Sequence, residues 1–149
     1  MDEKLKNDIF FVCTLIEAVS RKTMNRRRSI AEAMDIAGIS HELEYADVNH
    51  CLDMEQAIEE TIERYHIENG EYDTVSECRY KVPSVTAIGK VYQRLVLAVV
   101  NSYSSPAEAV YRVFSSFISD YISDFNSSVY YSSPDYLEVS FKEGRLLEM

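Results

Sequence analysis

Apolar residues recur at helical spacing along most of this chain, so its sequence favours a bundle of α-helices. In residues 2–21 they lie three or four positions apart, at Leu5, Ile9, Val12, Ile16 and Val19, which places them on one face of a helix. Further apolar residues widen this stripe until the middle of the segment is apolar nearly all round, as is typical of a central helix. The chain has four glycines and three prolines in 149 residues, which are too few for the turns between the strands of a many-stranded sheet.

Spacing and capping residues predict further helices after this first one. They cover residues 25–37, 40–48, 53–69, 84–101, 106–125 and 133–144. Asn25 is expected to cap the first of these, and Gly38 to take the left-handed conformation after its end. The clearest start is Ser105-Pro106, because a serine N-cap, a proline at the first position and Glu108 at the third make a capping box. The other expected N-caps are Asp53, Ser84 and Ser133.

Residues 70–82 are the least regular stretch and form either a short hairpin or an ordered loop, of which we favour the loop. The predicted fold is one all-α domain over residues 1–149, a bundle of five to seven helices. It divides into an N-terminal subregion (1–66), a loop (67–83) and a C-terminal subregion (84–149). We expect the helices at 5–19 and 106–125 to be buried against each other, with 85–99 packed against them.

Targeting signals and cysteine usage predict a cytoplasmic protein. The N-terminus carries mixed charges where a signal peptide would carry basic and then apolar residues. The longest apolar runs, residues 9–13 and 95–100, are too short to span a bilayer. The cysteines are odd in number and widely spaced, at Cys13, Cys51 and Cys78, which favours free thiols in a reducing compartment.

The formal net charge of −10 comes from one quarter of the chain. Residues 41–80 hold 12 acidic and 2 basic groups, whereas residues 1–40 hold 6 and 7, and residues 81–149 hold 7 and 6. This balance argues against nucleic-acid binding, because such binding depends on clustered cations. The helix predicted at 53–69 carries, among its carboxylates, Glu55, Glu59, Glu60 and Glu63. They form either a solvated face or a surface that attracts a basic protein partner.

A basic cluster, Arg26-Arg27-Arg28, stands at the first turn between helices. Guanidinium groups suit oxyanions, so one hypothesis is an anion-binding site for a phosphate or an acidic partner. The alternative is a solvated loop that balances the acidic quarter. A helix-turn-helix interpretation of residues 29–48 is disfavoured, because three carboxylates occupy the helix that would enter the groove of DNA.

Tyrosines and serines crowd the C-terminal third of the chain. Tyr130, Tyr131 and Tyr136 lie among Ser-Ser pairs and few charges. Tyrosine with serine is typical of recognition surfaces, because the ring buries area while its hydroxyl still forms hydrogen bonds. The alternative is that these rings complete a core that has no tryptophan.

Five residues of types able to bind metal gather on one short helix, at His41, Glu44, Asp47, His50 and Cys51. A metal-dependent hydrolase built on them is one alternative function. His41, Asp47 and His50 are the candidate ligands, but the chain lacks the His-Glu-x-x-His spacing of a helical zinc site. A polar helix surface is the commoner explanation, so we expect no metal and no cofactor. Neither a glycine-rich phosphate loop nor a Gly-x-Ser-x-Gly nucleophile turn is present.

The N-terminal segment resembles a small, uncharacterised all-helical family of Gram-positive bacteria. The resemblance is carried by Asn7–Ile16, Ile30–Met34 and Leu43–His50, and continues through the acidic helix to Tyr65, within residues 7–66. It implies a helical accessory protein of the toxin–antitoxin-associated kind and transfers no site residue.

The function predicted from the sequence is a non-enzymatic, cytoplasmic protein-interaction module, regulatory or antitoxin-like. Its partner is expected to bind the acidic helix and the tyrosine- and serine-rich region. A homo-oligomer stays open as a second kind of partnership, and no membrane partner is expected. The alternatives are the metal-dependent hydrolase and a nucleic-acid binder that uses Arg26–Arg28.

Overall fold

The computed structural model describes residues 2–49 and 51–148, which contain eight α-helices, two short 3₁₀-helices and no strand. The α-helices are α1 (Glu3–Thr23), α2 (Arg27–Glu44), α3 (Ala46–Asn49), α4 (Met54–Arg64), α5 (Val85–Val99), α6 (Pro106–Ser115), α7 (Ile118–Ser123) and α8 (Pro134–Glu143). The 3₁₀-helices are η1 (Val100–Ser102) and η2 (Val129–Tyr131). The prediction of an all-α bundle is confirmed, with a shorter third helix and one more break than expected.

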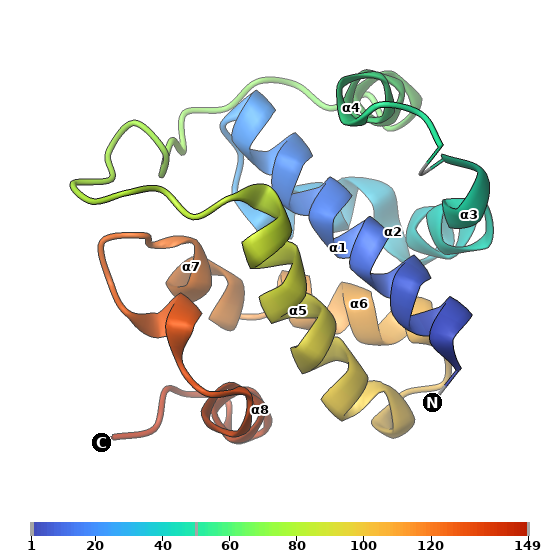
Figure 1. The fold of residues 1–149 in the computed structure, drawn as a ribbon. Coiled ribbons are helices and arrows are strands. Elements are labelled where there is room, and N and C mark those ends of the chain that lie inside the picture. The colour runs from blue at the N-terminus through green and yellow to red at the C-terminus, as the bar shows by residue number, and fades with distance from the viewer. Residues whose placement is uncertain (1, 50, 149) are drawn as a thin grey trace.

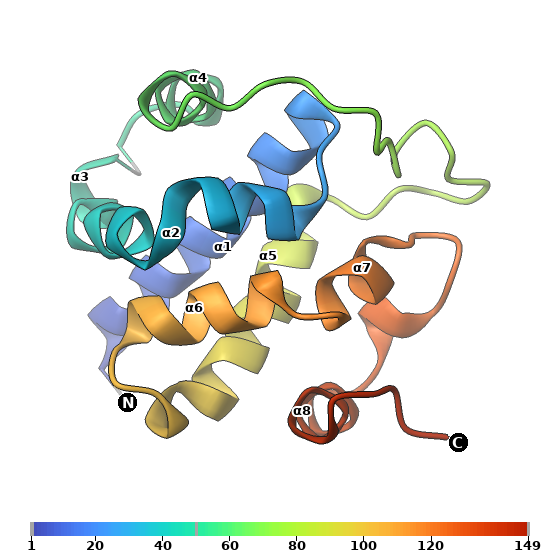
Figure 2. The same cartoon turned by 180° about the vertical axis from the view of Figure 1, so that it is seen from behind.

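The bundle has two main layers. Helices α1 and α5 lie side by side in one, and α2 and α6 in the other (Figures 1 and 2). Helix α4 lies against α1, and α8 lies against α5 on the opposite side of the bundle. None of the helices in the described residues is both long and apolar enough to cross a bilayer.

Helix α1 is central, as its broad apolar stripe predicts. Its fully buried apolar side chains are Ile9, Val12, Cys13, Leu15, Ile16 and Val19. The helix begins at Asp2, whose carboxylate accepts a hydrogen bond from the Lys4 amide at 3.0 Å. It ends at Met24, which adopts the left-handed conformation with φ 55°. Because α1 packs on α5 in its own layer and on α2 in the other, it also buries polar side chains, at Asp8, Thr14, Glu17, Ser20 and Thr23.

Four of the five expected N-caps are confirmed. The side chains of Asp53, Ser84, Ser105 and Ser133 each accept a hydrogen bond from the amide three residues later, at 2.8–3.2 Å. Asn25 does not cap α2, which begins one residue later without a side-chain cap at Arg26. The side-chain amide of Asn25 instead donates to the backbone carbonyl of Glu68 at 2.8 Å, and so connects the loop after α4 to the turn between α1 and α2.

The end predicted at Gly38 is wrong, because the helix continues through it to Glu44. The interruption lies at Asp35, with φ 62° and ψ 174°. Gly38 is needed for a different reason. A Cβ at this position would lie 2.7 Å from a ring carbon of Tyr65. The glycine therefore lets the helix approach the tyrosine.

The segment 106–125 is two helices, α6 and α7, and the expected unbroken helix is wrong. Ser116 between them is extended, with ψ 170°. The hydroxyls of Ser115 and Ser116 donate to carbonyls of the preceding turn, at 2.6 and 2.8 Å. Such bonds compete with the helical ladder. The expected packing is half correct, since α5 lies along α1 but α6 lies chiefly along α2.

The long connection between α4 and α5 is a loop, as expected for residues 70–82. Helix α4 ends at Arg64, earlier than predicted, and His66 then takes a left-handed conformation with φ 54°. Backbone amides of Gly70 and Tyr72 donate to carbonyls at the end of α1, each at 2.8 Å. The loop is thus held against the bundle by its own backbone.

Removing the Tyr65 hydroxyl is expected to lower the free energy of unfolding by about 1–2 kcal/mol. This hydroxyl donates to the buried Glu42 carboxylate at 2.6 Å and lies 3.1 Å from the Gly38 carbonyl. Glu42 keeps only its ion pair with Arg64 when the phenol is lost. Urea denaturation of Tyr65→Phe measures the loss. Tyr80→Phe, whose side chain is exposed, is the control, and equal stability of the two variants would disprove the role of this bond.

Candidate functional site

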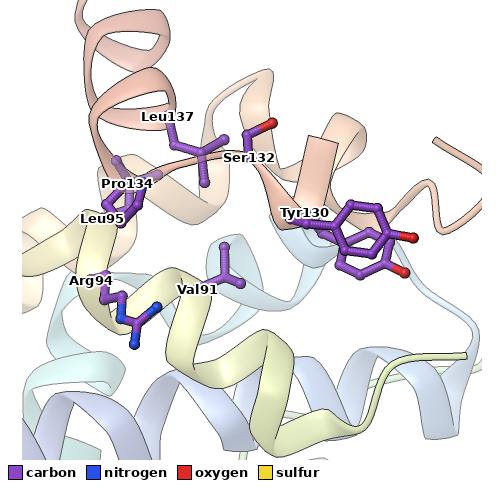
Figure 3. Close-up of a pocket in the computed structure, with 8 residues that line it drawn as sticks. Val91, Arg94, Leu95, Tyr130, Ser132, Pro134 and Leu137 are labelled. Carbon is purple, nitrogen blue, oxygen red and sulfur yellow. The ribbon is translucent and has the colours of Figure 1, made fainter. Parts of the chain in front are cut away.

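A groove of about 270 Å³ opens between α5, η2 and the start of α8 (Figure 3). Eight residues line it, namely Val91, Arg94, Leu95, Tyr130, Tyr131, Ser132, Pro134 and Leu137. Two of them, Tyr130 and Tyr131, are among the partner-binding residues predicted from the sequence. The other six come from α5 and from the segment around the start of α8, which lie next to each other only in the folded chain.

Regular helix geometry places the apolar walls of the groove. Val91 and Leu95 are four residues apart on α5, so they lie one above the other on the same face. On the opposite wall, Pro134 begins α8 and Leu137 follows one turn later (Figure 3). Leu95 and Leu137 are almost fully buried. The floor of the groove is therefore fixed by the contact between α5 and α8.

Tyr130 and Tyr131 lie at one end of the groove, with ring centroids 4.2 Å apart. Tyr130 also packs edge-on against the buried ring of Phe125, at 5.8 Å between centroids. Tyr131 is 68% exposed, the largest value among the exposed large hydrophobic side chains of the described chain. A hydrogen bond with Tyr131 is the main cause that raises the pKa of Tyr130 to about 12. The phenol is therefore uncharged at neutral pH.

Arg94 is the one ionisable cation among the lining residues, and it is exposed. Its neighbours Val91 and Leu95 place it at the edge of an apolar surface. Within the part of the chain that the structure describes, its guanidinium forms no ion pair. A donor group beside apolar walls, with no acidic partner, is suited to a ligand that brings its own acceptor.

A buried ion cluster supports this end of the groove from within. The ring of Phe125, against which Tyr130 packs, lies under two guanidinium groups. The Cζ atom of Arg21 is 4.9 Å from the centroid of this ring, and that of Arg27 is 5.8 Å from it. Both arginines bind Glu17. Arg27 donates to its two carboxylate oxygens at 2.8 and 2.6 Å, and Arg21 donates at 2.7 Å. The position of Tyr130 thus depends on a charge cluster that the sequence analysis did not identify.

The electrostatics of Glu17 follow from this arrangement. Its side chain is 0% exposed, and burial alone would raise the pKa of the carboxyl. The attraction and hydrogen bonds of Arg27, followed by those of Arg21, outweigh that effect and hold the pKa of Glu17 below its ordinary value. Glu17 is therefore ionised within the core.

The predicted anion-binding arginines do not share one open surface. Arg27 is 1% exposed and points inward to Glu17. Arg26 and Arg28 both bind Asp120, at 3.1 and 2.7 Å. Arg26 also lies over the ring of Tyr72, 4.3 Å from its centroid. These contacts give the basic cluster a structural role at the junction of α2 and α7, and anion binding by it stays a prediction.

The other predicted partner-binding residues lie away from the groove. On α4 the side chains of Glu55, Glu59 and Glu63 are exposed and that of Glu60 is half-buried, opposite a face that packs on α1. The Tyr136 hydroxyl donates to the Leu147 carbonyl at 2.9 Å, so this tyrosine anchors the C-terminal segment. Partner binding by the acidic face stays a prediction.

The candidate metal ligands are not brought together. Among the described residues, no group of three or more His, Cys, Asp or Glu side chains is arranged to hold a metal ion. His41 packs against Tyr45, with ring centroids 4.8 Å apart. His50 lies outside the described residues, so its part in the hypothesis has no structural counterpart. The hydrolase alternative gains no support from the positions of His41, Glu44 and Asp47.

Comparison of the chain with models of protein families, with curated proteins and with solved structures finds no match. The resemblance of residues 7–66 to a helical family of Gram-positive bacteria therefore stays a prediction. What can be inferred about function comes from the groove itself.

Proposed function

We propose that this chain is a non-enzymatic protein-interaction module that binds a segment of a partner protein in the groove between α5, η2 and α8. The observation that carries the proposal is the exposed Tyr131 ring beside an apolar floor built from Leu95 and Leu137. Exposed tyrosine next to apolar side chains is the composition that protein interfaces enrich.

The size of the groove favours a side chain as its occupant. At about 270 Å³ it is smaller than most cofactor and small-molecule sites, which span roughly 300–1,000 Å³. It suits one or two anchoring side chains of a longer segment, which are the usual source of binding energy in an interface. The remainder of the segment would lie over the exposed rim.

The acidic face of α4, made of Glu55, Glu59, Glu60 and Glu63, is the second surface of the proposed module. It lies on the far side of the bundle from α8 (Figures 1 and 2). Its charge would attract a basic region of the same or another partner and speed encounter.

We place this activity in the cytoplasm, because the partly buried Cys78 and the fully buried Cys13 are free thiols. A regulatory or antitoxin-like role fits such a module.

Selection of a phage-displayed library of random dodecapeptides on the folded chain tests the proposal. We expect enrichment of peptides with an aromatic or aliphatic anchor. The enriched peptides should lose at least about tenfold in affinity on Tyr131→Ala, since a central tyrosine is a typical hot spot. Fluorescence anisotropy of labelled peptides measures the loss.

Tyr80→Ala is the matched control, because Tyr80 is 64% exposed, close to the 68% of Tyr131, and does not line the groove. Its affinities should equal those of the unmodified chain. Failure to enrich any peptide, or equal losses in the two variants, would refute binding at this groove.

A further inference from the structure

We infer that the groove selects a partner segment in which an aromatic or aliphatic side chain lies within a few residues of an Asp or Glu side chain, and that Arg94 binds this carboxylate. The inference rests on the proposed function and names the chemistry of its ligand. The juxtaposition that carries it is an unpaired guanidinium at the edge of an apolar groove.

Arg94 differs from the arginines around the bundle core because its charge is not used internally. Arg21 and Arg27 hold Glu17, Arg26 and Arg28 hold Asp120, and Arg64 holds Glu42. Arg79, Arg112 and Arg145 also form no ion pair among the described residues, but of these four unpaired arginines only Arg94 lines the groove. Arg94 stays available to an acidic group from outside.

The surroundings of Arg94 strengthen a carboxylate contact. The guanidinium presents planar, paired donors that match the two oxygens of a carboxylate. A bound segment would cover the partly exposed Val91 beside it and exclude water from the pair, and an ion pair is stronger where water is excluded. An apolar anchor and a carboxylate therefore reinforce each other when both come from one segment.

The carboxylate is assigned to a side chain rather than to the C-terminus of a partner. C-terminal carboxylates are commonly captured by sets of free backbone amides. Here the amides of Tyr131 and Ser132 donate within η2, to Ser128 and Val129. The amides of Tyr136 and Leu137 at the start of α8 donate to Ser133. Arg94 is then the principal recognition group, and a side-chain carboxylate satisfies it.

The carboxylates on α4 do not oppose an acidic ligand at the groove. Residues 81–149, which supply all eight lining residues, hold 6 basic and 7 acidic groups. Helix α4, which bears the acidic face, lies on the opposite side of the bundle from α8 (Figures 1 and 2). Beyond a Debye length of about 8 Å the repulsion of its carboxylates is largely screened at physiological salt.

The experiment compares dodecapeptide selections on the unmodified chain, on Arg94→Gln and on Arg94→Glu. The unmodified chain should enrich Asp or Glu near the apolar anchor. Arg94→Gln should keep the anchor but lose the acidic preference, and Arg94→Glu should enrich Lys or Arg instead. For the best peptide, changing its acidic residue to the amide should weaken binding by at least about fivefold, the upper range for an exposed pair, because the bound segment excludes water from this one.

Each result separates this inference from the proposed function. Peptides that bind through Tyr131 without acidic preference, or an unchanged preference on Arg94→Glu, would overturn the role of Arg94 and leave the module intact. No enrichment on the unmodified chain would overturn both. A peptide with a free C-terminus should bind like its C-terminal amide, whereas binding that needs the free acid would overturn the assignment to a side chain.

Discussion

Replacing Glu17 by glutamine is expected to lower the free energy of unfolding by about 3–5 kcal/mol, the usual cost of removing one partner of a buried ion pair. Glutamine has nearly the same shape, so the loss reports charge rather than packing. Arg27 would remain a buried cation without an anionic partner, since its only ion-pair partner among the described residues is Glu17. Arg21 would also lose its carboxylate, but its side chain is 15% exposed.

Urea denaturation followed by circular dichroism measures this effect, with Glu63→Gln on the exposed face of α4 as the control. Should Glu17→Gln not fold, the double variant Glu17→Met, Arg27→Met provides a second test. Replacing both charges with apolar groups of similar length is often neutral, so it should regain most of the lost stability. A cost below about 1 kcal/mol for Glu17→Gln, or no recovery in the double variant, would contradict the structural role of the pair.

The same pair predicts a pH dependence of stability. Because the pKa of Glu17 is lower in the folded chain than its unfolded value of about 4.3, the unfolded state binds the proton more readily. The contribution of Glu17 is therefore fully present above that unfolded value and is lost as the pH falls through the folded-state pKa. Stability measured in urea should fall more steeply in acid for the unmodified chain than for Glu17→Gln.

Helix positions were predictable because they depend on local chemistry. The stripe on α1 and the serine or aspartate caps at Asp53, Ser84, Ser105 and Ser133 act within a few residues. The interruptions were less predictable. Asp35 takes a positive φ inside an otherwise helical pattern, and Ser116 breaks the strongest predicted helix, although both lie in segments with continuous apolar spacing. At Ser116 the serine hydroxyls bond to carbonyls of the preceding turn in competition with the helical ladder, and apolar spacing does not show which of the two prevails.

The groove was predictable only in part, since two of its eight lining residues could be chosen from the sequence. Tyr130 and Tyr131 could be chosen from composition alone, whereas Arg94 matters because no carboxylate reaches it once the chain has folded. Conversely, Arg27 looked like a surface cation, and only the fold shows its partner in α1. One signal was available in the sequence, since Glu17 stands between Ile16 and Ala18 in the apolar middle of the first predicted helix. A carboxylate in such a place needs a buried cation.

Replacing Gly89 by alanine is expected to destabilise the chain by about 3 kcal/mol, at the upper end of the usual cost of overpacking a core. At an exposed position in a helix, changing glycine to alanine stabilises the fold by about 1 kcal/mol. The sign of the change in the free energy of unfolding is therefore itself a test. Gly89 is buried where α5 crosses α1. A Cβ there would overlap the Thr14 hydroxyl oxygen, and it would lie 3.0 Å from the Thr14 Cβ and 3.1 Å from the Thr14 Cα. The Cα cannot move without shifting α1, so the two helices must separate.

Thermal and urea unfolding of Gly89→Ala, Thr14→Ala and the double variant form a cycle that assigns the cause. Thr14→Ala alone should cost little, because its hydroxyl has no hydrogen-bond partner among the described residues. In the double variant the shortest contact is gone while the Cβ contact at 3.0 Å persists, so part of the stability should return. Lys90→Ala, at an exposed position on the same helix, controls for helix propensity. If Gly89→Ala cost as much in the Thr14→Ala background as in the unmodified chain, the close approach of these two residues would not be the cause, and if it stabilised the chain, α1 and α5 would not cross at Gly89 as described.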